Sequence, residues 1–244
     1  MVRKDSFFVF AFAMAFSFAL VGCGEGKTGI SASSENFEAD SISEVSETQT
    51  ESVSTTPVAR EDNVGAKISA DGTFRTFPVY TDGSSPDNHF VASGWMGDFS
   101  DLKINEKNLD NPQAGSTSIQ IVYTNKATQG ARWSGIYWQN PPNNWGTRPG
   151  GYDLTGARKL TFWARGEKGG ERIEEFKIGG ITGEYADSDV AGIGPVVLTT
   201  EWQQFTIDLE GKDLSSISGG FCWATNLDVN PDGATFYLDD IRFE

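Results

Sequence analysis

From Lys67 to the end of the chain, short apolar–polar alternations are interrupted by Gly, Pro, Asn and Asp, and this pattern limits the fold more than any other feature. A period of two is typical of strands with one buried face, and the interrupting residues favour turns. No stretch shows helical periodicity over three turns. We therefore predict an all-β domain over residues 67–244, built as a two-sheet antiparallel β-sandwich. The expected strands are Phe74–Tyr80, His89–Trp95, Ser118–Tyr123, Trp133–Trp138, Lys159–Ala164, Ile173–Ile178, Gln203–Leu209, Gly220–Ala224 and Thr235–Phe243.

The same alternation predicts which side chains are buried. In the segment 159–165, Leu160 and Phe162 share one face, whereas Trp163 and Arg165 share the other. We expect the apolar set to face the core and the mixed aromatic and polar set to face outward. By the same reasoning the outward sets of other strands contain Glu175, Lys177, Trp202, Gln204 and Thr206.

The first 22 residues have the features of an export signal. Arg3 and Lys4 precede the apolar run 7–21, which is too short to span a bilayer comfortably. The sequence Leu-Val-Gly-Cys at 20–23 resembles a bacterial lipobox, and this resemblance implies that residues 1–22 are a signal peptide and that Cys23 carries lipid. The alternative is an ordinary secretory signal with a chance cysteine. Both alternatives predict an exported protein.

Residues 23–66 differ in composition from the rest of the chain. They are rich in Ser, Thr and Glu and contain few large apolar side chains, so burial cannot offset the entropy of ordering them. We predict a disordered acidic linker that joins the lipid-bearing Cys23 to the domain 67–244. The protein would then be lipid-anchored to the cell envelope, at the outer membrane or the cell surface.

Charge and cysteine content exclude several classes of function. The formal net charge is −15, which argues against nucleic-acid binding because a phosphate backbone requires a basic face. An anionic membrane would also repel the chain, so membrane attachment must come from acyl groups at Cys23. If Cys23 is lipidated, Cys222 has no partner within the chain, and we expect no disulfide. We expect a monomer.

Histidines are scarce, whereas carboxylates are too abundant for any one pair to indicate a glycosidase. His89 is the only histidine, so a histidine-rich zinc site is excluded and a Ser-His-Asp triad would have to use it. Adjacent carboxylates such as Glu174 and Glu175 point to opposite faces of a strand, which disqualifies them as a glycosidase pair. We therefore expect a protein that is not an enzyme.

The segment 133–146 combines Trp, Tyr, Asn and Gln with two prolines and predicts a strand that runs into a rigid loop. Aromatic rings pack against the C–H face of a sugar, and amide and guanidinium groups bond its hydroxyls. Several of the aromatic residues are expected to be core. Trp145 and Trp163 are the hardest to explain as core residues, because one lies on the loop and the other on an outward strand position. The candidate binding residues are Trp138, Gln139, Asn143, Asn144, Trp145, Arg148, Trp163, Arg165, Glu175 and Lys177.

Three segments, 152–166, 201–209 and 236–243, resemble the β-sandwich carbohydrate-binding modules that share the galactose-binding-domain-like jelly roll. The resemblance implies non-catalytic binding of a polysaccharide or oligosaccharide. Such modules bind on the concave face of one sheet or at loops along one edge. The concave-face candidates are Trp163, Arg165, Glu175 and Lys177, and the edge candidates are Gln139, Asn143, Asn144, Trp145 and Arg148.

The resemblance also implies a structural Ca²⁺ with Asp239 as a ligand. Asp239 shares strand parity with Ile241 and Phe243 and is expected to point inward, where an unpaired carboxylate would be costly. Asp82 and Asp98 are the candidate partners. The alternative is a carboxylate capped by backbone N–H groups. A lower-ranked metal site would use Asp187 and Asp189.

Two other functions stay open. A glycan-active hydrolase or lyase would need carboxylates that converge in a cleft. A structural or adhesion lipoprotein of the envelope would use the same sandwich to bind a protein partner, through an exposed apolar patch without a sugar-sized groove.

Overall fold

The structure is a computed structural model that describes residues 72–244. The predicted signal peptide, the lipidated Cys23 and the acidic linker lie outside the described residues. Among residues 72–244, no helix is long and apolar enough to cross a membrane. The helical content of this part is the three-residue 3₁₀ turn η1, Phe99–Asp101.

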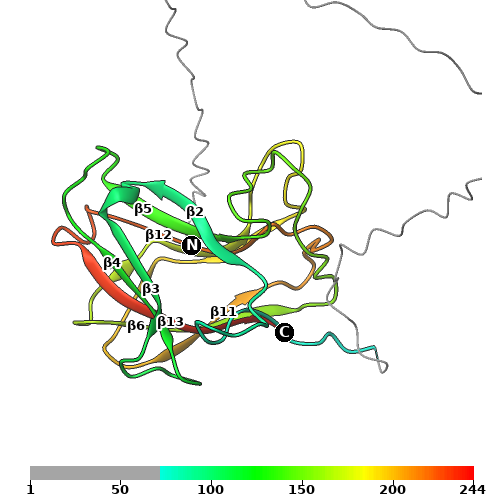
Figure 1. Cartoon of the computed structure of the whole chain (residues 1–244), viewed down its shortest axis with the longest axis horizontal. Coiled ribbons are helices and arrows are strands. Elements are labelled where there is room, and N and C mark those ends of the chain that lie inside the picture. The colour runs from blue at the N-terminus through cyan, green and yellow to red at the C-terminus, as the bar shows by residue number, and fades with distance from the viewer. Residues whose placement is uncertain (1–71) are drawn as a thin grey trace, which may run out of the picture. The chain divides into compact units, whose positions relative to one another are not determined.

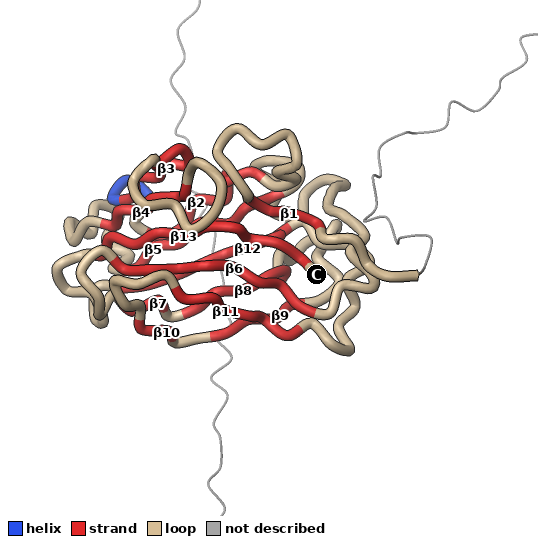
Figure 2. Tube along the Cα trace, turned by 90° about the horizontal axis from the view of Figure 1, so that it is seen from below, coloured by secondary structure: helices blue, strands red, loops and turns tan. Residues whose placement is uncertain are grey.

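Two antiparallel sheets face each other, as predicted (Figures 1 and 2). The first sheet has the strand order β11-β6-β13-β4-β3, and β1 also pairs with β13. Its strands are β1 (Phe77–Tyr80), β3 (Leu102–Asn108), β4 (Ser118–Tyr123), β6 (Lys159–Gly166), β11 (Gln203–Asp208) and β13 (Ala234–Phe243).

The second sheet has the order β2-β5-β12-β8-β9. The short strands β7 and β10 pair with each other outside both sheets. The strands are β2 (Val91–Gly97), β5 (Trp133–Gln139), β7 (Arg172–Ile173), β8 (Glu175–Gly179), β9 (Val190–Ile193), β10 (Val196–Val197) and β12 (Gly219–Asn226).

The core lies between the two sheets. Leu160, Phe162 and Ala164 of β6 are fully buried, which confirms the predicted inward face. The ring of Phe162 lies 4.7 Å from that of Phe176 on β8, so this pair joins the sheets. Each such side chain stabilises the fold by about 1.5–3 kcal/mol through removal of its surface from water.

The strand predictions fail where a strand is short or its sequence is polar. β3, β9 and β10 were not predicted, since the sequence Leu-Lys-Ile-Asn-Glu-Lys-Asn of β3 has only two apolar side chains. The expected strand Ile173–Ile178 is two strands, because Ile173 pairs with Val196 of β10 while 175–179 joins the second sheet. The alternation of apolar and polar residues does not show that the two parts of this segment pair with different strands.

A bulge in β13 reverses the predicted direction of Asp239. Phe243 pairs with Leu160 and faces the core, but the register shifts between Asp239 and Arg242. Asp240 lies within this shift with φ of 47°. Because one extra residue is accommodated, Asp239 has an outer-face position opposite Trp163, and the prediction that it faces the core is wrong, although its side chain is fully buried and accepts the N–H groups of Gln113 and Ala114.

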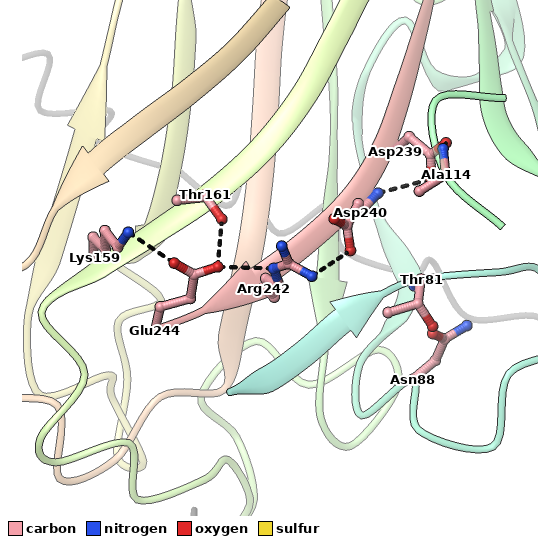
Figure 3. A network of polar contacts seen from close by, with 9 residues as sticks. All are labelled: Thr81, Asn88, Ala114, Lys159, Thr161, Asp239, Asp240, Arg242 and Glu244. Carbon is pink, nitrogen blue, oxygen red and sulfur yellow. Dashed lines mark hydrogen bonds and ion pairs between the residues drawn. The ribbon is translucent and has the colours of Figure 1, made fainter. Parts of the chain in front are cut away.

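Charged side chains tie the end of β13 to β6, as Figure 3 shows. The Glu244 carboxylate pairs with Lys159 Nζ at 2.8 Å and with Arg242 Nε at 2.8 Å. Arg242 Nη1 also reaches the Asp240 carboxylate at 3.1 Å. These contacts hold the end of β13, which follows the bulge, against β6.

Candidate functional site

Trp145 lies on the loop 140–151, which follows β5. It is 39% exposed, and its ring stands edge-on to that of Tyr137, with centroids 5.9 Å apart and an interplanar angle of 86°. Tyr137 is itself buried and fixed, because its hydroxyl donates to the Gly179 carbonyl at 3.0 Å. The exposed indole is thus supported by the second sheet.

A second loop, 180–188, is packed against the first. Tyr185 N donates to the Gly146 carbonyl at 3.0 Å. A Cβ on Gly146 would lie 2.1 Å from the Thr182 carbonyl oxygen, and φ at this glycine is 75°. Both observations require glycine here. In Figure 1 the two loops, green and yellow, rise together beside the second sheet.

Two of the predicted edge residues are used to build the loop. Gln139 is fully buried, and its amide donates to the Asn144 carbonyl at 3.0 Å and accepts from Ser93 Oγ at 3.0 Å. Asn144 is also fully buried, and its Nδ2 donates to the Arg148 carbonyl at 2.9 Å. Their side chains hold the loop instead of facing a ligand, so their assignment as binding residues is wrong.

Other predicted edge residues are exposed. Asn143 has φ of 61° and its backbone N–H donates to Ser93 Oγ, which leaves its side chain at the surface. Arg148 is exposed, and one terminal nitrogen donates to the Pro142 carbonyl at 2.5 Å. Both lie on the same loop as Trp145.

Trp138 belongs to the core, and its assignment as a binding residue is wrong. It shares the inner face of β5 with Ile136 and is fully buried. Its indole nitrogen donates to Glu106 Oε1 on the first sheet at 3.3 Å. The ring therefore connects the two sheets.

The outer face of the second sheet lies beside these loops. Glycines occupy four of its positions, where a Cβ would meet Tyr137, Met96, Lys177 or Ile181; they are Gly94, Gly135, Gly192 and Gly219. Gly94, Gly135 and Gly219 are buried, so neighbouring side chains such as Tyr137 and Met96 pack over them, and only Gly192 is exposed. At the end of β9, a hollow of about 280 Å³ is lined by Glu174, Glu175, Gly192, Ile193 and Gly194.

An ion pair lies on this face. Lys177 Nζ is 2.8 Å from Glu175 Oε2 and 5.6 Å from the centroid of the Tyr137 ring. Burial pushes the pKa of Lys177 down, but Cys222 and Glu175 outweigh burial, and the net pKa is raised. The ammonium group therefore stays charged and can donate to a ligand hydroxyl, while the half-exposed Glu175 carboxylate can accept.

Trp163 and Arg165 are not part of this face. They lie on β6 of the first sheet, and Glu175 and Lys177 lie on β8 of the second. Since all four point away from the core, the two pairs are on opposite sides of the sandwich. The prediction that they form one concave surface is wrong, because alternation gives the face of a strand but not the sheet to which it belongs.

The three carboxylates predicted to bind Ca²⁺ do not converge. Asp239 Oδ2 accepts the N–H groups of Gln113 and Ala114 at 2.8 and 3.1 Å. Asp98 accepts three backbone N–H groups of residues 129–132, and Asp82 accepts those of residues 116 and 117. Across residues 72–244, no group of three or more metal-binding side chains is present. These residues therefore do not fit a shared calcium site and match the alternative of capped carboxylates.

The lower-ranked metal pair has the same kind of role. Asp187 accepts N–H groups from Ile181 and Ser218 at 2.9 and 2.5 Å, and Asp189 pairs with Lys212 at 3.2 Å. These contacts fasten the loop 180–188 in place.

Sequence reasoning missed Tyr137, Tyr185 and the glycines of the outer face. Tyr137 has the parity of an outward residue on β5, so alternation could have identified it. The glycines pair with larger residues on the neighbouring strands, such as Tyr137 and Lys177, and this placement depends on strand pairing, which the sequence does not show. A larger cleft of about 420 Å³ lies where β4 and β6 end and β13 begins, and none of the predicted binding residues lines it.

No protein-family model matches the chain, and no curated protein matches its sequence. Solved structures with a similar course of the chain include a family 30 carbohydrate-binding module, which has 17% identity and a TM-score of 0.49 and aligns over 70% of this chain and 99% of its own. The family 30 module of a cellulosomal cellulase from Clostridium thermocellum has 18% identity and a TM-score of 0.44 over 70% and 98%.

A family 11 module from the same organism, solved with a β-1,3-1,4-mixed-linked tetrasaccharide, has 12% identity and a TM-score of 0.36 over 58% of this chain and 80% of its own. These likenesses concern the course of the chain and leave the ligand of this protein open.

Proposed function

We propose that this protein binds a polysaccharide or oligosaccharide, without chemical conversion, on the outer face of its second sheet. The observation that carries the proposal is Trp145, a 39% exposed indole that Tyr137 supports beside the outer face of the second sheet. The exposed part of this residue remains in contact with water and adds nothing to the stability of the fold. Its ring face suits the C–H face of a sugar.

The dimensions and polarity of this face support a chain-like ligand. Five strands at about 4.8 Å spacing give a width of about 19 Å from β2 to β9. The Lys177–Glu175 pair offers donors and an acceptor on the same surface. A net charge of −15 disfavours polyanions over most of the protein and is compatible with a neutral glycan.

The experiment that tests this proposal is affinity electrophoresis against a panel of soluble neutral polysaccharides. Trp145→Ala should weaken retention by at least about 1 kcal/mol, roughly the worth of one aromatic contact. The matched control is Phe99→Ala, which removes a 50% exposed ring at the other end of β5. If the Trp145 and Phe99 variants migrate alike on every polysaccharide that retards the wild type, the site is wrong.

The non-catalytic part of the proposal has its own test. Incubation of the protein with the retained polysaccharide should release neither reducing ends nor unsaturated products. Release of either product would make the protein a hydrolase or a lyase. Binding to a protein partner, the other alternative, would leave all glycans without effect on migration.

We also propose that Cys23 anchors the protein to the cell envelope through lipid, as the lipobox resemblance implies. Such an anchor would keep captured glycan near the cell. Growth with labelled palmitate should label the wild type, and Cys23→Ala should remove the label while the protein is still exported. A labelled Cys23→Ala protein would contradict the anchor.

Structural Ca²⁺ stays a prediction, now without Asp82 and Asp98 as partners of Asp239. If a calcium ion contributes to stability, EDTA will lower the melting temperature and added Ca²⁺ will restore it. Equal melting curves would leave the capped carboxylates as the full account of these side chains.

A further inference from the structure

On the outer face of the first sheet, Arg165 is a cation without a counter-ion. The residue is only 7% exposed, and its Nε is sealed from solvent without a hydrogen-bond partner. Within residues 72–244, all ion pairs involve basic side chains other than Arg165. A charge withdrawn from water is costly unless an opposite charge or hydrogen bonds compensate it. The chain has 34 acidic residues, yet Arg165 forms no ion pair with any of them within the described part.

Aromatic rings hold the guanidinium in one position. Its Cζ lies 3.7 Å from the centroid of Tyr237 and 5.3 Å from that of Trp202. The Tyr237 hydroxyl donates to Glu167 Oε2 at 2.6 Å, and Trp202 Nε1 donates to the Asn111 carbonyl at 3.0 Å. Because both rings are fixed by their own hydrogen bonds, Arg165 is oriented before any ligand arrives. Its terminal Nη groups, unlike the sealed Nε, are not among the buried unpartnered atoms, and no hydrogen bond within residues 72–244 occupies them.

Trp163 lies on the same face of β6, two residues along the strand, so the Cα atoms of the two residues are about 6.6 Å apart. It is partly exposed, and Gln204 of β11, which is exposed, lies directly opposite it. An indole, an amide and an unpaired guanidinium therefore share one face, and Asp239 of β13 lies on the other side of Trp163, where the N–H groups of Gln113 and Ala114 occupy its carboxylate.

We propose that Arg165, Trp163 and Gln204 form a second binding site, which takes the carboxylate-bearing ring of a uronic-acid residue in an acidic polysaccharide. The guanidinium fork matches a carboxylate with two parallel hydrogen bonds. The indole packs against the C–H face of the ring, and the amide bonds a hydroxyl. The site extends the proposed function, because it lies on the opposite sheet and selects its ligand by charge.

The first test compares two forms of one polymer on the full chain. Polygalacturonate and its fully methyl-esterified form share the sugar ring but differ in charge. In about 0.15 M salt the Debye length is about 8 Å, so repulsion between the acidic protein and the polymer is largely screened. Retention by polygalacturonate should be at least tenfold stronger than retention by the ester. Equal retention by both polymers, or retention by neither, would overturn the proposal.

Variants then locate the site. Arg165→Gln removes the charge and should lower retention by polygalacturonate at least tenfold, and Arg165→Lys, which keeps the charge without the fork, should give an intermediate value. If Arg165→Gln does not fold, Trp163→Ala and Gln204→Ala carry the test, since both side chains reach the surface. Wild-type retention in every folded variant would overturn the assignment.

Trp145→Ala separates this proposal from the first one. It should lose retention by neutral polysaccharides and keep retention by polygalacturonate, whereas the Arg165 variants should show the opposite behaviour. Loss of both activities in Trp145→Ala would place the uronate on the second sheet and overturn the second site.

Discussion

Trp138 and Trp145 belong to one continuous segment of the sequence, yet one is fully buried and the other is 39% exposed. Trp138 has an inward position on β5 and donates to Glu106 on the opposite sheet. Trp145 follows the strand on a loop whose backbone is fixed by buried amides. Strand parity and the start of the loop therefore decide the role of each indole, because residue type alone is the same.

The same substitution at these two positions should change the free energy of unfolding by very different amounts. Trp138→Ala should lower the free energy of unfolding by about 3–5 kcal/mol through loss of core contacts. Trp145→Ala should change it by no more than about 0.5 kcal/mol, as surface substitutions do. Urea unfolding followed by circular dichroism measures both. A large destabilisation by Trp145→Ala would mean that this ring is structural.

At the scale of elements, the loops 140–151 and 180–188 act as one unit. Gly146 allows the close approach, since any side chain there would collide with the Thr182 carbonyl. Gly130 has a similar φ of 78° but no atom within 4 Å of its missing Cβ. The two glycines thus form a matched pair that separates backbone strain from the contact between loops.

Gly146→Ala should destabilise the protein more than Gly130→Ala and should also weaken retention by neutral polysaccharides. Both variants pay about 1–2 kcal/mol for the left-handed backbone, but only the first separates the loops and moves Trp145. Thermal unfolding and affinity electrophoresis provide the two measurements. Equal behaviour of the variants would show that loop contact does not support the site.

Asp187 fastens the loop 180–188 to β12, and its effect should depend on pH. Burial raises the pKa of its carboxyl above the ordinary 3.8, although backbone N–H groups oppose the shift. The folded state then binds this proton more tightly than the unfolded chain, so the stability of the wild type falls as pH rises through and above 3.8.

Asp187→Asn cannot ionise and should therefore gain stability relative to the wild type between about pH 4 and pH 7. The amide of Asn also faces backbone N–H donors at a cost in stability, but this cost does not change with pH. It therefore cancels when the stability difference between the two proteins is compared at the two pH values. Urea unfolding of both proteins at the two pH values measures the change. A stability difference that stays constant with pH would contradict the burial of a charged carboxylate here.

At the scale of the whole molecule, the core is held without a disulfide in the described part. Cys222 is a free thiol, buried on β12 between β5 and β8, and burial raises its pKa. Only loss of the second sheet exposes this sulfur. Its reactivity should therefore report unfolding of the domain.

A thiol reagent should leave Cys222 unmodified in the native protein and should modify it with the same urea midpoint as circular dichroism. Reducing agent should not change the melting temperature. Cys222→Ala serves as the blank for the reaction. Rapid modification in native conditions would show that the second sheet opens locally.

The sequence by itself determined the fold class and the buried side of most strands, because both follow from local alternation and turn residues. Leu160, Phe162 and Phe176 are buried as alternation predicts. The exposure of Trp145 also followed from its loop position. These properties depend on near neighbours in the chain, which a sequence displays directly.

Only the tertiary structure decided which strands share a sheet and which polar groups are already used. It placed Trp163 and Arg165 on the other side of the sandwich from Glu175 and Lys177. It also buried Gln139 and Asn144 in a loop, and a bulge moved Asp239 to the outer face of its sheet. The physical reason is that pairing between distant strands and the satisfaction of buried polar groups are properties of the whole fold.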